Sequence, residues 1–244
     1  MVFGLFSSKE KSLEKTISKA TNKLAQQADR WAALEKLKDD GSEDALVGLC
    51  KRWNITSNKA IEDEQEKEWV VQTLVAHGAA AIPAVRRHLK SAEHLSFALR
   101  TLERIADHDT TLAIADELFA SEPPGYVRMP ERRIDLITWF REWKAGTDEE
   151  IVSRLAPYVT DFDENSRFAA IEGMGGRKAE LITPPLIEAL LRPEEESGRI
   201  KRAVVEVLVK AKAPLGDKAQ AVAGALEGPL AYDFKVDGGV LKKR

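Results

Sequence analysis

The chain has 244 residues, of which 43% are hydrophobic, so it is long enough to bury a substantial core and too apolar to stay disordered. Its formal net charge of -3 argues against a dedicated nucleic-acid-binding protein, and it has no apolar run of membrane-spanning length. The single cysteine, Cys50, cannot form an internal disulfide and indicates a reducing compartment, so we expect a cytoplasmic protein.

The first predicted element is an amphipathic helix within residues 1–28. Leu13, Ile17, Ala20 and Leu24 recur at helical spacing on one face, and lysines dominate the rest of the segment. One interpretation is a cap on the repeats that follow, because the terminal unit of a repeat array needs an atypical outer face. The other is a peripheral contact with an anionic membrane or a partner protein.

Six helical segments between residues 29 and 228 share one column pattern. They begin at Ala33, Val70, Ala98, Asp135, Ala169 and Ala203, with spacings of 37, 28, 37, 34 and 34 residues. Four residues further along, on the same helix face, stand Leu37, Leu74, Leu102, Trp139, Gly173 and Val207. A second helical pattern follows each of these segments, so we predict helix pairs of about 34 residues, a period typical of helical repeats.

The most regular second segment reads HGAAAIPAVRRHL, at residues 77–89. With Gly78, Ile82, Pro83, Val85 and Leu89 in place, it resembles the HEAT-repeat family, including the short variant known from phycobilin lyases. The resemblance covers residues 29–228 and implies an all-α fold, a right-handed α-solenoid of about six HEAT-like helix pairs. Tetratricopeptide repeats have a similar period, but their Trp, Leu-Gly and Tyr signature is not found in the first helices.

Two segments depart from the helical period. An irregular Pro-Gly linker at residues 121–132 separates the third and fourth predicted pairs, as a spacer, a hinge or an exposed loop. In the tail, residues 229–244, Tyr232, Phe234 and Val236 alternate ahead of a glycine-rich turn signal. The tail is therefore expected to form either a small hairpin or a flexible basic end.

No catalytic or metal-binding motif emerges from the sequence. The histidines lack the spacing of a metal-binding helix, and no phosphate-binding glycine loop or nucleophile–base pair is found. Residues 161–172 place acids at calcium-loop positions, but Ser166 stands where that loop needs glycine, and the repeat register makes the segment a helix. We therefore predict no enzymatic activity, no cofactor and no bound metal.

A set of basic residues recurs in the predicted second helices: Lys51, Arg52, Arg86, Arg87, Arg154 and Arg192. By the resemblance to HEAT arrays, second helices line the inner face of the solenoid. These residues predict either solvated side chains or a stripe that binds an acidic or phosphorylated segment of a partner. The functional expectation is a protein-interaction scaffold or adaptor whose partner and oligomeric state stay open. The alternative is a nucleic-acid-binding protein of the DNA alkylpurine glycosylase type, which the acidic charge balance opposes.

Overall fold

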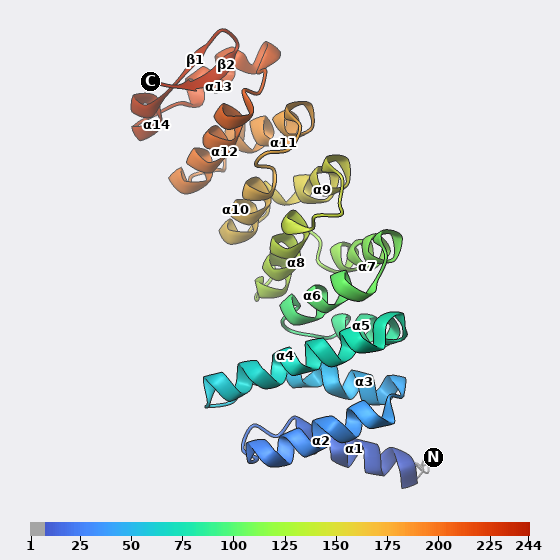
Figure 1. Ribbon diagram of the computed structural model, residues 1–244. Coiled ribbons are helices and arrows are strands. Elements are labelled where there is room, and N and C mark those ends of the chain that lie inside the picture. Colours follow the sequence, from blue (N-terminus) through green and yellow to red (C-terminus); the bar gives the residue numbers. More distant parts are fainter. Residues whose placement is uncertain (1–7) are drawn as a thin grey trace, which may run out of the picture. The chain divides into compact units, whose positions relative to one another are not determined.

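The computed structural model describes residues 8–244, and most of them are helical. The chain divides into two compact units, residues 1–118 and residues 119–244. Figure 1 shows the helices following one another in chain order within each unit. The prediction of a mainly helical protein is therefore confirmed. None of the helices between residues 8 and 244 is both long enough and apolar enough to cross a bilayer.

Unit 1 is built from two layers of helices. Its elements are α1 (Ser8–Ala20), α2 (Gln27–Asp40), α3 (Glu43–Cys50), η1 (Lys51–Asn54), α4 (Ala60–His77), η2 (Gly78–Ala81), α5 (Ile82–Leu89), α6 (Ser96–Ile105) and most of α7 (His108–Ser121). One layer forms where α2 packs on α4 and α4 on α6, and the other where α3 packs on α5. The predicted first helices thus lie in one layer of this unit and α3 and α5, both predicted second helices, in the other.

The column pattern of the sequence marks the core of unit 1. Its column residues are all buried: Ala33, Leu37, Val70, Leu74, Ala98 and Leu102. The turn from α2 to α3 shows which residues end one helix and begin the next. Gly41 adopts φ +62°, which suits glycine, and the Ser42 hydroxyl accepts a hydrogen bond from the Ala45 N–H. Local capping chemistry therefore reverses the chain so that neighbouring helices bury these columns against each other.

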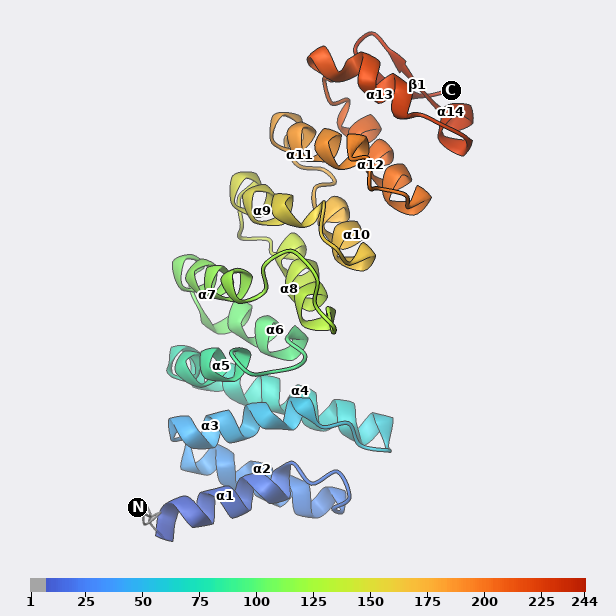
Figure 2. The same cartoon turned by 180° about the vertical axis from the view of Figure 1, so that it is seen from behind.

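Unit 2 repeats the two-layer arrangement (Figure 2). Its elements are α8 (Glu131–Glu142), α9 (Asp148–Leu155), η3 (Ala156–Tyr158), α10 (Glu164–Gly173), α11 (Ala179–Leu191), α12 (Gly198–Ala211), η4 (Gly216–Lys218), α13 (Ala219–Ala225), α14 (Pro229–Asp233), β1 (Phe234–Asp237) and β2 (Val240–Lys243). Here α8 packs on α10 and α10 on α12, while α9 packs on α11 and α11 on α13.

The core face of α8 differs from the predicted column. Asp135 and Trp139 are only half-buried, whereas Leu136 and Phe140, one residue later, are fully buried. Trp143 at the end of this helix is buried as well, at the position where four of the other five predicted first helices end with Gly41, Gly78, Ala106 and Ala211. The face of α8 that enters the core is therefore turned by one residue, which lets the large aromatic rings pack together.

The N-terminal helix is shorter than predicted. Helix α1 ends at Ala20, and the following residues form turns in which the Asn22 side chain accepts a hydrogen bond from the Leu24 N–H. Leu24, expected on the apolar face, is 81% exposed, so that part of the prediction is wrong. Residues 1–7 of the predicted segment lie outside the described residues. Helix α1 packs against α2 and α3, as a cap would.

The tail forms a β-hairpin, one of the two alternatives expected from the sequence. Strands β1 and β2 pair antiparallel with Phe234 opposite Lys243, and the two turn glycines have φ values of +62° and +76°. Phe234 and Leu241 are buried, and the strands pack on α12 and α13. An isolated hairpin is marginal in water, so this packing supplies the apolar contact that it needs.

The seat of α1 on α3 leads to a first prediction. Gly48 lies in α3 so close to Ile17 that an added Cβ would stand 2.7 Å from the Ile17 Cγ1. Gly48→Ala is therefore expected to lower the free energy of unfolding by about 1–3 kcal/mol, measured by urea denaturation, because α1 must shift. The control is Gly224→Ala, in helix α13, where nothing lies within 4 Å of the added Cβ.

Gly224→Ala should leave stability unchanged or slightly raised, since alanine favours the helix over glycine. The penalty of Gly48→Ala should also be smaller in an Ile17→Ala background, where the clash is relieved. Equal effects of the two glycine substitutions would contradict the close packing of α1 on α3.

Candidate functional site

Arg52 is buried in unit 1, although the sequence placed it on a surface stripe. Its relative exposure is 0%. Its Nε donates to Glu66 Oε2 at 2.6 Å, Nη2 to Asp63 Oδ1 at 2.7 Å and Nη1 to the Ile55 carbonyl at 2.8 Å. The prediction that Arg52 is a surface partner-binding residue is therefore wrong, because its guanidinium is held by acceptors within the unit.

The partners of Arg52 belong to a buried ionic network. Arg30 of α2 donates to Glu66 at 2.8 Å, and Lys67 contacts Asp63 at 2.7 Å. The side-chain hydrogen bond to Glu66 raises the pKa of Arg30. Burial by itself raises the pKa of Asp63, but hydrogen bonds from Lys67 and other donors outweigh it and lower that pKa below its usual value. The network joins α2, η1 and α4, so its role is structural.

The positive charges of Arg86 and Arg87, exposed in unit 1, are paired with acidic side chains on neighbouring helices. Arg86 of α5 forms a two-bond pair with Glu117 of α7, and this hydrogen bond lowers the pKa of Glu117. Arg87 of α5 donates to Asp44 of α3 at 2.7 Å. Lys51 is exposed at the start of η1. The charges expected to form a basic stripe thus link α5 to its neighbours, and exposed pairs of this kind stabilise a fold only weakly.

In unit 2 the two predicted arginines have different surroundings, and both are half-buried. Arg154 of α9 lies over the ring of Phe140, with 6.0 Å from its Cζ to the ring centroid, and donates to the Glu150 carbonyl. Arg192 directly follows α11 and donates to the Thr160 carbonyl at 2.7 Å. Arg192 also lines two cavities, which makes it the predicted residue closest to a candidate site.

Three cavities follow one another along α11. The first, of about 480 Å³, has mostly apolar walls that include Pro184, Ile187 and Leu215. The second, of about 560 Å³, shares Glu188 and Leu191 with the first. The third, of about 550 Å³, shares Arg192 with the second. Adjacent cavities share lining residues, and we call the three cavities together the α11 groove.

Two prolines shape the apolar end of the groove. Helix α11 begins at Ala179, so Pro184 and Pro185 lie in its interior. A proline there has no N–H for the carbonyl four residues earlier, which weakens the helix at that turn. Just before the two prolines, the Thr183 hydroxyl donates to the Ala179 carbonyl at 2.6 Å. Pro184 is exposed and forms part of the apolar wall.

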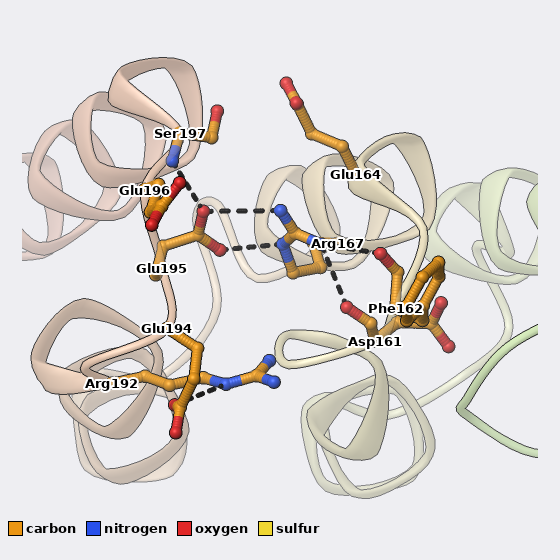
Figure 3. Close-up of a pocket in the computed structure, with 9 residues that line it drawn as sticks. All are labelled: Asp161, Phe162, Glu164, Arg167, Arg192, Glu194, Glu195, Glu196 and Ser197. Atoms are coloured by element: carbon orange, nitrogen blue, oxygen red, sulfur yellow. Dashed lines mark hydrogen bonds and ion pairs between the residues drawn. The ribbon is translucent and has the colours of Figure 1, made fainter.

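The other end of the groove is charged (Figure 3). Figure 3 shows Arg167 of α10 directed across the cavity toward Glu195, and these two side chains make contacts of 2.7 and 3.2 Å. Arg167 also donates to the Phe162 carbonyl at 3.0 Å. Glu195 is buried and accepts a hydrogen bond from the Ser197 N–H at 2.9 Å. The loop between α11 and α12 is thereby fixed to the start of α10.

This contact repeats in the preceding helix pair and was missed in the sequence. Arg133 of α8 pairs with Asp161 at 2.9 Å, and both side chains are buried. Arg167 and Glu195 stand 34 residues after Arg133 and Asp161 respectively. The signal that would have revealed the pairs is this recurrence in two successive repeats: an arginine in the first helix and an acid 28 residues later, at the end of the same repeat.

Acids outnumber bases along the α11 groove. The acidic lining residues are Asp161, Glu164, Glu188, Glu194, Glu195, Glu196 and Asp217, against Arg167, Arg192 and Lys218. Asp161 and Glu195 are held in buried pairs, but Glu194 and Glu196 are exposed. Across the cavity from them, Phe162 is 66% exposed, with its ring edge-on to exposed Tyr126 at a centroid distance of 5.2 Å. This end of the groove is therefore both anionic and aromatic.

The segment that resembled a calcium loop is a helix start, as expected. The Asp163 carboxylate caps α10 by accepting a hydrogen bond from the Ser166 N–H at 2.8 Å. Among residues 8–244, no three His, Cys, Asp or Glu side chains are grouped so that they could hold a metal ion. No protein-family model, curated protein or solved structure matches the chain. The candidate site is therefore defined by the α11 groove alone.

The correction at Arg52 leads to a second prediction. Arg52→Met leaves Glu66 and Asp63 without one of their buried counter-charges, and we expect the free energy of unfolding to fall by about 3 kcal/mol. Arg86→Met removes an equally charged but exposed side chain and should not change stability measurably. Urea denaturation followed by circular dichroism compares the two. A similar loss in both variants, or in neither, would contradict a structural role that is specific to Arg52.

Proposed function

We propose that this chain is a non-enzymatic protein-interaction scaffold built from HEAT-like helix pairs, and that the α11 groove holds an extended segment of a partner protein. The observation that carries the proposal is the run of three cavities along α11 that share lining residues. The proposal includes a right-handed α-solenoid of six pairs, for which α2 to α13 supply the helices. The two-layer packing within each unit supports it.

The dimensions of the groove favour a peptide chain as its ligand. Helix α11 has 13 residues, which corresponds to about 20 Å of helix at 1.5 Å per residue. An extended segment of roughly six residues spans the same length at about 3.3 Å per residue. Each of the three cavities is large enough for a side chain, so alternate side chains of one extended segment, which point to the same side, fit successive compartments.

The competing proposals receive less support from the contacts. A nucleic-acid ligand needs a basic groove, whereas acids predominate in the α11 groove. An acidic or phosphorylated partner at Arg86 and Arg87 stays a prediction, and such a ligand would compete there with Glu117 and Asp44. The packing of α1 on α2 and α3 supports its role as a cap rather than as a membrane contact. We place the scaffold in the cytoplasm because its one cysteine is free and buried.

A third prediction tests the groove as a binding surface. The photo-crosslinking amino acid p-benzoylphenylalanine replaces exposed Glu188, which lines two of the cavities, and separately exposed Glu172 of α10, which lines none of the three. After irradiation in a lysate of the source organism, we expect a discrete adduct with another protein at position 188. Position 172 should give no such adduct, because it lies outside the groove.

Unchanged melting temperatures would show that both replacements leave the fold intact. The same adducts at both positions, or no adduct at position 188, would contradict the proposal that the α11 groove holds a partner.

A further inference from the structure

We infer that the segment bound in the α11 groove is aliphatic at one end and basic at the other, with about four residues between the two parts. This inference rests on the proposed function and adds the chemistry of the partner. The groove has unlike ends, and each end selects a different kind of side chain.

The apolar end selects an aliphatic side chain. Ile187 and Leu215 form its floor and are nearly buried, with exposures of 7% and 2%, while Leu191 is half-buried and Pro184 is exposed. An aliphatic group entering this cavity removes apolar surface from water on both sides, which is favourable without any directional bond. Two of the four polar residues of the same cavity, Asp217 and Lys218, already contact each other at 3.5 Å.

The charged end selects a lysine or arginine. Within the described part of the chain Glu196 forms no ion pair, and Glu194 is 69% exposed with a single ion pair, to Arg192. Figure 3 shows these acids on one side of the cavity and the ring of Phe162 on the other. A cation between them has carboxylates on one side and an aromatic ring on the other, and both groups attract cations.

An acidic segment would meet the opposite conditions. Two arginines line the charged end, but Arg167 is held by Glu195 and by two backbone carbonyls, and Arg192 by the Thr160 carbonyl and Glu194. An incoming carboxylate would have to displace these bonds while facing uncompensated Glu196. The charge of the groove therefore favours a cationic partner.

The spacing of the two ends fixes the spacing in the ligand. From Ile187 to Glu194–Glu196 the chain advances by about eight residues, mostly in helix α11 and the turn after it. The four helical residues from Ile187 to Leu191 cover about 6 Å at 1.5 Å per residue, and the three to five residues of the turn add up to about 3.3 Å each, so the two ends lie roughly 10–20 Å apart. An extended segment covers that distance with about four residues. Peptides in which the basic and aliphatic parts are adjacent cannot reach both ends.

Fluorescence anisotropy with the full chain tests the inference, using three labelled synthetic peptides. The first has two lysines, a four-residue Gly-Ser spacer and two leucines. The second has glutamates in place of the lysines, and the third has the same composition as the first with the spacer moved to one end. We expect the first peptide to bind at least ten-fold more tightly than the other two at physiological salt.

Charge and apolar variants then locate the binding. Glu194→Lys with Glu196→Lys should weaken the first peptide at least ten-fold. The matched control, Glu172→Lys with Glu180→Lys, changes the net charge equally at exposed positions outside the groove and should leave affinity unchanged. Leu191→Asp should weaken binding similarly, and Pro184→Glu provides the same test at an exposed position that tolerates a polar side chain.

The outcomes separate the inference from the proposed function. Tighter binding of the glutamate peptide, weakened by Leu191→Asp or Pro184→Glu, would overturn the inferred charge and leave the groove as a binding site. Equal affinity of the first and third peptides would overturn the inferred spacing. If neither groove variant weakens any peptide more than the control does, the proposed function fails together with the inference.

Discussion

In two successive helix pairs of unit 2, a buried pair between an arginine and a carboxylate fixes the loop at the end of the helix pair to the first helix of that pair. Arg133 reaches Asp161, and Arg167 reaches Glu195, at the same separation along the chain. A displaced loop would leave a charge buried without its partner, which is far more costly than a displaced apolar contact. The position of the loop that leads into the next helix pair, and hence the surface that this loop exposes, depends on these contacts.

The same interaction shapes the candidate site. Glu195 is drawn inward by Arg167 and by the Ser197 N–H, and this fixes the short loop between α11 and α12. Its neighbours Glu194 and Glu196 are consequently turned toward solvent at the end of the α11 groove. The groove thus has an anionic end because a structural ion pair fixes the loop that carries the acids.

The charged residues of unit 1 show how one residue type performs different roles. Arg52 follows α3 and Arg86 lies in α5, and both helices were predicted as second helices. Yet Arg52 is buried among acids, whereas Arg86 is exposed beside one acid. Their sequence neighbours are alike: each adjoins another basic residue. What distinguishes them is the acid that the fold brings close, Glu66 in one case and Glu117 in the other.

The sequence by itself determined the helices and the residues that face the core, because helical periodicity and capping are local. Leu37 and Leu74 were predicted as core positions for that reason, and the glycine-rich turn of the tail indicated its hairpin. Only the tertiary structure decided the rotation of α8, the partners of Arg52 and the α11 groove. These depend on contacts between residues about 10 to 30 positions apart, and on the volumes of side chains that meet there. A local sequence pattern does not predict such contacts unless they recur at the repeat period, as the arginine–carboxylate pairs of unit 2 do.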